Sequence, residues 1–202
     1  MSKDAPGVRY AEVDKETRAT RVQAVIDLDG GERRDVSTGI PFFDHLLGQF
    51  AEVGQLDLGV VCEGDLLVDD HHSVEEVGTV LGRAIRLCLD DNTAIHTVAG
   101  NITPVDDALV TCALDLAGRG QLHWDVPFKR ERIGTMATES VREFFRAVSA
   151  GGHITIHLRK MAGENDHHLC EALFKAFGFA LHEATRRMER HSLSGLVKSK
   201  RD

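Results

Sequence analysis

The sequence predicts an α/β protein, more closely an α+β sandwich, in which one unit of strands and helices occurs twice. Two observations lead to this prediction. The pattern His-His-x-x-Glu occurs at residues 71–75 and again at residues 167–171, and each copy opens a long helical pattern. Before each copy we expect a helix that begins with a Phe-Phe pair, at residues 42–43 and 144–145. Self-similarity of this kind is typical of an internal duplication.

In the first half, alternating apolar residues at 22–29 predict a strand that stops at Gly30-Gly31, and a second strand leads to Gly39. Pro41 then stands near the start of a helix over 41–53, where its missing N–H is tolerated. Strands are predicted over 56–61 and 65–68, with a turn at Gly64 between them. A long helix follows over 72–89.

The second half repeats this order. Strands are predicted over 109–116 and 121–124, around a turn at residues 118–120. A helix over 138–148, a strand over 154–158 and a long helix over 168–190 complete the unit. The predicted division is therefore a first half at 1–92, a second half at 93–191 and a basic C-terminal tail at 192–202.

Composition excludes several classes of protein. Of the 202 residues, 42% are hydrophobic and 28% are charged, as in a soluble globular protein. No stretch approaches the roughly 20 apolar residues of a membrane helix, and the N-terminus lacks the apolar core of a signal peptide. A cytoplasmic location is therefore expected. The net charge of −8 argues against a nucleic-acid partner. Four widely spaced cysteines in apolar runs are expected to be buried free thiols: Cys62, Cys88, Cys112 and Cys170.

The histidine pairs are the candidate metal ligands. Residues four apart on a helix share a face, so His71 can converge with Glu75, and His167 with Glu171. Adjacent histidines point in directions about 100° apart, so one pair can serve two different metal ions. Imidazole and carboxylate donors favour Mn²⁺, with Fe²⁺, Co²⁺ or Zn²⁺ as replacements. The alternative, a run of exposed polar residues at a helix start, explains one copy better than two.

His45 alone is a weaker candidate, since a single histidine on an amphipathic helix is more often packed against the core. The remaining histidines carry no spacing signal and are interpreted as structural or surface residues: His96, His123, His153, His157, His182 and His191.

With these motifs the chain resembles the imidazoleglycerol-phosphate dehydratase family from about Arg9 to the C-terminus. The matching segments are Ser37-Thr38-Gly39-Ile40-Pro41-Phe42-Phe43-Asp44-His45, Gly64-Asp65 with Val68-Asp69-Asp70-His71-His72, Asp115-Leu116-Ala117-Gly118-Arg119, and Asn165-Asp166-His167-His168 leading to Glu171-Ala172 and Phe174-Lys175-Ala176.

The resemblance implies a duplicated fold, each half a four-stranded sheet backed by helices, assembled through metal into a 24-subunit homo-oligomeric shell. It further implies sites between subunits that hold two Mn²⁺ ions each. The implied metal ligands are His45, His71, His72, Glu75, His167, His168 and Glu171, with Glu143 where a family histidine can stand. Of these, His45, His72, Glu75 and Glu171 are also expected to take part in catalysis.

The family reaction removes water from imidazoleglycerol phosphate, in histidine biosynthesis, to give an enol that becomes imidazoleacetol phosphate. The resemblance implies that metal on the imidazole nitrogen favours the imidazolate, whose electrons help to expel the hydroxyl group. Five residues match family positions near this small-molecule substrate: Gln49, Arg119 and Lys175, with Ser199 and Lys200 in a poorly matching phosphate loop.

The chain departs from the family on the substrate side. Ala19 stands where a catalytic Glu is expected, and Glu16 would need a shifted register to replace it. Val53 replaces a His, Thr97 an Arg that contacts phosphate, Ala137 an Asp, and Asp107 a Glu. Three hypotheses follow: an authentic dehydratase of the family, a paralogue that acts on another metal-chelating small molecule, or a metal-binding shell without catalysis. A Glu16 that reaches the metal ligands would favour the first hypothesis.

Overall fold

The computed structural model describes residues 8–89, 94–117 and 119–188. The first half contains β1 (Tyr10–Glu16), β2 (Thr20–Asp27), β3 (Arg34–Ser37), α1 (Pro41–Gly54), β4 (Asp57–Gly64) and α2 (His71–Leu89). The second half contains β5 (Val98–Val105), β6 (Ala108–Asp115), β7 (Leu122–Asp125), the hairpin β8 (Arg132–Ile133) and β9 (Met136–Ala137), α3 (Thr138–Gly152), β10 (Thr155–Ala162) and α4 (Asp166–Thr185). Apart from the hairpin, the two halves have the same order of elements.

The two halves also have the same sheet topology. The first sheet has the order β1-β2-β4-β3 and the second the order β5-β6-β10-β7. In each sheet two antiparallel pairings are followed by one parallel pairing, β3 with β4 and β7 with β10. This arrangement confirms the predicted sandwich of two four-stranded sheets backed by helices.

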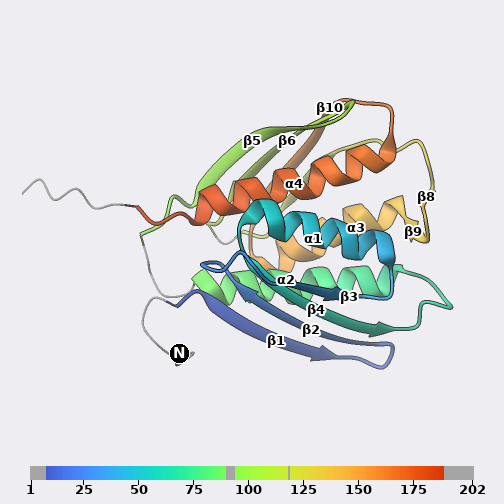
Figure 1. Ribbon diagram of the computed structural model, residues 1–202, viewed down its shortest axis with the longest axis horizontal. Coiled ribbons are helices and arrows are strands. Elements are labelled where there is room, and N and C mark those ends of the chain that lie inside the picture. The colour runs from blue at the N-terminus through green and yellow to red at the C-terminus, as the bar shows by residue number, and fades with distance from the viewer. Residues whose placement is uncertain (1–7, 90–93, 118, 189–202) are drawn as a thin grey trace, which may run out of the picture.

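The helices form one layer between the two sheets (Figure 1). Helix α2 packs on β1 and β2 of the first sheet, and α4 packs on β5 and β6 of the second. Within the layer the helices pair across the halves, since α1 packs on α4 and α2 packs on α3. The two halves are thus joined through their helices.

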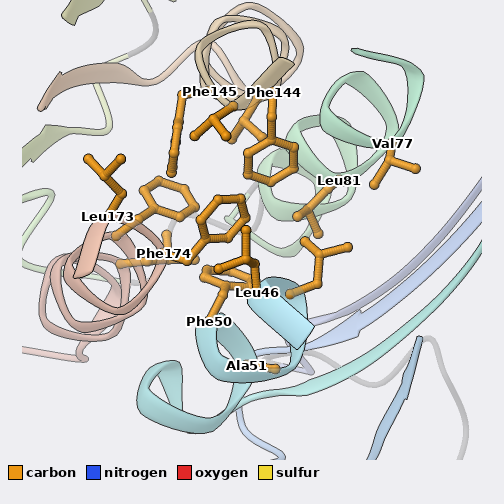
Figure 2. Close-up of a cluster of buried hydrophobic side chains, with 14 of the residues drawn as sticks. Leu46, Phe50, Ala51, Val77, Leu81, Phe144, Phe145, Leu173 and Phe174 are labelled. Atoms are coloured by element: carbon orange, nitrogen blue, oxygen red, sulfur yellow. The ribbon is translucent and has the colours of Figure 1, made fainter. Parts of the chain in front are cut away.

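A cluster of aromatic and aliphatic side chains fills the middle of the helical layer (Figure 2). Phe144 of α3 meets Phe43 of α1 edge-to-face and stacks on Phe174 of α4, with ring centroids 5.3 and 5.0 Å apart. All three side chains are fully buried. Burying a side chain of this size contributes roughly 1.5–3 kcal/mol, so this cluster is a main source of stability.

Equivalent glycines allow the paired helices to approach closely. A Cβ on Gly82 of α2 would lie 2.4 Å from the carbonyl oxygen of Val148 and 2.7 Å from the amide nitrogen of Gly152. A Cβ on Gly178 of α4 would lie 2.6 Å from the carbonyl oxygen of Phe50 on α1. The same contact therefore occurs at both helix pairs, which supports the duplication independently of the histidine motifs.

Three local predictions were wrong. Residues 65–68 form a turn rather than a strand, closed by hydrogen bonds from Leu66 N to Gly64 O and from Val68 N to Asp65 O. The apolar pattern there was misleading because Leu67 is fully exposed. The Phe144-Phe145 pair lies in the middle of α3, not at its start, so it is not equivalent to the first pair. Helix α4 ends at Thr185, before the predicted end at residue 190.

Strands β1 and β5 were not predicted because both lie at sheet edges and bury little. Ala11 is the buried residue of β1 and Thr103 that of β5, so neither strand shows a clear apolar alternation. The predicted half boundary at 92/93 and the tail at 192–202 lie outside the described residues and stay predictions.

The four cysteines are free and buried, as predicted. Burial raises the pKa of the Cys88 thiol to about 12 and that of Cys112 above its ordinary value, so both remain protonated at neutral pH. None of the helices described is long and apolar enough to cross a membrane.

The glycine contacts predict that replacement by alanine has opposite effects on the free energy of unfolding at Gly82 and at Gly48. Gly82→Ala pushes a methyl group into the backbone of α3, so we expect a loss of about 3 kcal/mol in the free energy of unfolding. Gly48→Ala is the control, because a Cβ there meets nothing within 4 Å. Gly48 is inside α1, where alanine should stabilise by about 0.5–1 kcal/mol. Urea unfolding of both variants measures the difference, and equal effects would refute the close contact.

Candidate metal site at the helix pairs

The pairing of helices brings the predicted ligands together in two clusters. The first cluster lies between α1 and α4 and contains His45, Gln49, His167 and Glu171. His45 Nε2 is 2.8 Å from Glu171 Oε1, and His167 Nε2 is 3.5 Å from the same oxygen. One ligand atom from each of these three side chains lies within 4.8 Å of the other two, a set that could hold a metal ion. His45, weak as a candidate in the sequence alone, is thus part of a three-ligand group.

Gln49 closes the first cluster from the side of α1. Its Nε2 donates to Glu171 Oε1 at 2.8 Å and lies 2.9 Å from His45 Nε2. Its Oε1 is buried and has no hydrogen-bond partner in the described structure. Both the histidine nitrogen and the carboxylate oxygen that a metal would use are therefore held by one amide, which an arriving ion would have to displace.

The Glu171 carboxylate is kept in its charged form. Partial burial would raise its pKa, but hydrogen bonds with His45 and Gln49 and the charge of Lys175 outweigh this and lower the pKa below the ordinary value. Lys175 follows Glu171 by one helical turn and faces the same side of α4. At neutral pH the cluster therefore offers an ionised oxygen ligand.

The second cluster lies between α2 and α3 and contains His71, Glu75, Glu143 and Arg146. His71 Nε2 is 3.9 Å from Glu75 Oε2. Arg146 forms ion pairs with both acidic residues, through Nη2 to Glu75 Oε1 and through Nε to Glu143 Oε2 at 2.5 Å. Arg146 was not singled out in the sequence, although its position three residues after Glu143 on a helix was a signal for an ion pair.

The second histidine of each pair points away from these clusters. The rings of His71 and His72 are inclined by 87°, and those of His167 and His168 by 89°. His72 is exposed and makes no hydrogen bond among the described residues. His168 Nδ1 lies 2.7 Å from Asp107 Oδ1, so the carboxylate orients the ring. The rings of each pair are therefore nearly perpendicular, and service of two metal ions by one pair stays a prediction.

Buried aspartates fix the start of both histidine helices. Asp70 Oδ2 accepts a hydrogen bond from the amide of Ala137 at 2.6 Å. Asp166 Oδ2 accepts from the amides of Lys129 and Arg130 at 2.8 and 2.7 Å. Each aspartate therefore ties the residue before a histidine pair to a loop beside α3. Asn165 adds an N-cap, since its side chain accepts from the amide of His167.

The predicted substrate residues are spread more widely. Gln49 lies in the first cluster and Lys175 beside it, but Arg119 follows the far end of β6 and is 3.8 Å from Asp115 there. Thr97 lies at that same end, where its amide donates to Ala184 O and its carbonyl accepts from Leu116. Ser199 and Lys200 lie outside the described residues.

The departures from the family stand as follows. Ala19 is exposed in the turn between β1 and β2, where its amide donates to Thr17 Oγ1. Glu16 is exposed and makes no hydrogen bond or ion pair within the part of the chain described, so it does not reach the predicted ligands. Ala137 is the N-cap residue of α3 and supplies no side-chain cap.

Comparison with known proteins agrees with this fold. The family model described as imidazoleglycerol-phosphate dehydratase matches residues 38–181. The protein of that name from Acetivibrio thermocellus is 45% identical over 192 residues, covering 95% of this chain and 97% of its own. The one from Jannaschia sp. is 47% identical, covering 88% and 91%. The crystal structure of imidazoleglycerol-phosphate dehydratase from Staphylococcus aureus has a TM-score of 0.80 at 30% identity, covering 89% of this chain and 99% of its own.

The fold and the site together define a duplicated two-sheet protein with His/Glu clusters between helices of opposite halves. The chain belongs to the imidazoleglycerol-phosphate dehydratase family, a family of metal-dependent hydro-lyases.

The His168–Asp107 contact makes a prediction about pH. Hydrogen bonding to Asp107 raises the pKa of His168 above its ordinary value, and the same contact lowers the pKa of Asp107. The stabilisation from this pair is therefore present below the ordinary histidine pKa of about 6.5 as long as Asp107 is ionised. It is lost as the pH rises through the raised pKa of His168, and again as the pH falls through the lowered pKa of Asp107.

Exchange of the imidazole C2 proton, followed by mass spectrometry of the metal-free protein, measures this pKa. Asp107→Asn should return the His168 pKa toward the ordinary value, whereas Asp125→Asn, on β7, should leave it unchanged. A His168 pKa that does not respond to Asp107→Asn would contradict the assigned contact.

Proposed function

We propose that this chain is a manganese-dependent dehydratase that converts imidazoleglycerol phosphate to imidazoleacetol phosphate in histidine biosynthesis. The observation that carries the proposal is the three-ligand group of His45, His167 and Glu171, present in a chain 45% identical to a dehydratase of that name over almost its whole length. This group joins residues far apart in the sequence at the contact of α1 with α4.

The donor set fits a divalent metal ion. Two imidazoles and an ionised carboxylate suit Mn²⁺, with Fe²⁺, Co²⁺ or Zn²⁺ as replacements, and the unpartnered Gln49 Oε1 leaves one further oxygen donor beside them. Two clusters related by the duplication support two ions per site. When bound, such an ion would supply Lewis acidity at the imidazole of the substrate.

The residues of the chain have separate roles in this proposal. Glu171 stays ionised and holds the first cluster together through His45 and Gln49. Lys175 supplies a positive charge one turn further along α4, suited to an anionic end of the substrate. His45, His72, Glu75 and Glu171 are the proposed catalytic groups, and Glu143 and His168 complete the proposed ligands.

The position of the second histidines, His72 exposed and His168 half-buried, supports assembly of several copies. His72 and His168 face away from the clusters of their own chain, so a neighbouring copy can use them. Arg119, remote from the first cluster within one chain, can reach a site only in such a neighbour. A homo-oligomer with sites between subunits, a 24-subunit shell in the cytoplasm, is therefore the proposed state, with two half-repeats that divide near residue 92.

One observation favours a second candidate, a paralogue that acts on another metal-chelating small molecule. A cavity of about 630 Å³ continues from Lys175 along α1 and α4. Its walls include Val53, Ile102 and Phe179, and its acidic residues Glu52 and Glu183 outnumber its one lysine. This lining suits an apolar or neutral group better than a phosphate dianion.

Turnover of imidazoleglycerol phosphate by the Mn²⁺-loaded protein tests the proposal. We expect dehydration, and we expect His72→Ala to reduce kcat by about 10²-fold or more, as for loss of a group that acts directly on the substrate. His96→Ala is the control, because His96 is an exposed histidine outside both clusters.

The outcomes separate the candidates. Turnover that persists in His96→Ala and disappears in His72→Ala supports the dehydratase. Metal binding without turnover of the phosphate ester overturns it. Turnover of an unphosphorylated azole alcohol instead would establish the second candidate, and no turnover of either compound would indicate a shell without catalysis.

A further inference from the structure

The two clusters occupy equivalent positions but differ in composition. Helices α1 and α3 both end at a left-handed residue, Gln55 with φ 50° and His153 with φ 54°. When these ends are superposed, His45 of α1 corresponds to Glu143 of α3, and Gly48 corresponds to Arg146. On the partner helices the ligands are the same in both copies, a histidine followed four residues later by a glutamate.

The α2/α3 cluster therefore contains two charged groups that the α1/α4 cluster lacks. Glu143 adds a second carboxylate, and Arg146 adds a guanidinium that contacts Glu75 and Glu143 together. The pKa of Arg146 is raised, first by the hydrogen bond with Glu143. The guanidinium holds one oxygen of each carboxylate, Glu75 Oε1 and Glu143 Oε2, so a metal ion that used these two oxygens would have to replace it, whereas Glu75 Oε2, 3.9 Å from His71, lies outside this contact.

The α1/α4 cluster has no arginine contact of this kind among the described residues. Its carboxylate is held by the neutral amide of Gln49 and by His45. A metal ion entering there displaces neutral donors, and the positive charge of Lys175 stays one helical turn from Glu171. An ion entering the α2/α3 cluster must in addition compete with two ion pairs of Arg146, which opposes its binding.

We propose that the two clusters bind metal unequally. The α1/α4 cluster binds its ion directly, whereas an ion at the α2/α3 cluster must displace the guanidinium of Arg146 from Glu75 and Glu143. Arg146 acts as an internal counter-cation that keeps Glu75 and Glu143 paired until a second ion replaces it. The inference rests on the proposed metal dependence and concerns the order of binding, not the reaction.

Titration of the metal-free protein with Mn²⁺, followed by calorimetry and by the spin-resonance signal of free Mn²⁺, tests this proposal. The wild-type protein should show a tight and a weak class of sites, with dissociation constants at least about tenfold apart. Arg146→Gln should strengthen the weak class about tenfold and leave the tight class unchanged. The double variant Glu143→His, Arg146→Gly gives the α2/α3 cluster the α1 residues at these two positions and should bring the two classes closer together.

Arg142→Gln is the matched control. Arg142 is exposed on the same helix, and its replacement by Gln removes the same positive charge. It should change neither class, which separates the Arg146 contact from a general effect of charge. Arg146 itself is half exposed, so its replacement should leave the thermal midpoint nearly unchanged.

Two equal classes in the wild-type protein would overturn the proposal, and so would an Arg146→Gln variant that changes neither class or both. Because the measured quantity is metal binding, a lack of dehydratase turnover would refute the proposed function without affecting this result. A wild-type protein that binds no Mn²⁺ would refute both the proposed function and the unequal binding.

Discussion

The close contact between helices of opposite halves is the constraint on which the rest of the structure depends. Gly82 and Gly178 bring the backbones of α2 and α4 against those of α3 and α1. That approach places His45 within 2.8 Å of Glu171, and it places Arg146 on Glu75. The aromatic contacts of Phe144 on α3 with Phe43 on α1 and with Phe174 on α4 hold three of the helices together, and Val77 and Leu81 of α2 belong to the same buried cluster (Figure 2). Packing and ligand geometry are therefore set by the same contacts.

The sheets contribute by fixing where each helix begins. Each histidine pair follows a strand and stands at the first turn of its helix, where Asp70 or Asp166 ties it to a loop of the second half. Backbone amides donate to Oδ2 of each buried carboxylate, whereas Oδ1 of Asp70 and of Asp166 has no hydrogen-bond partner among the described residues. The first turn of the helix is thus rigid on the side of the protein core, while its outer histidine remains exposed.

Much of the fold and part of the candidate metal site could be predicted from the sequence. The repeated His-His-x-x-Glu and the helical spacing after it predicted the duplication, the two long helices and their ligand faces, because those signals are local. The pairing of His45 with Glu171 is not local, and only a resemblance could suggest it. Residues 65–68 were mistaken for a strand because an apolar side chain looks the same in sequence whether it is buried or, like Leu67, fully exposed. Edge strands such as β5 bury too few side chains to show the alternation of apolar and polar residues that predicts a strand.

The pairing of helices across the halves has a consequence for how such a protein can change. A chain of half this length, carrying one histidine pair, would need a second copy of itself to form either cluster, and symmetry would make the two clusters identical. Joining the copies in one polypeptide removes that identity. The sequence can then alter one cluster, as Glu143 and Arg146 do, without altering its counterpart between α1 and α4. Gene duplication here separates two sites that a symmetric dimer would force to evolve as one.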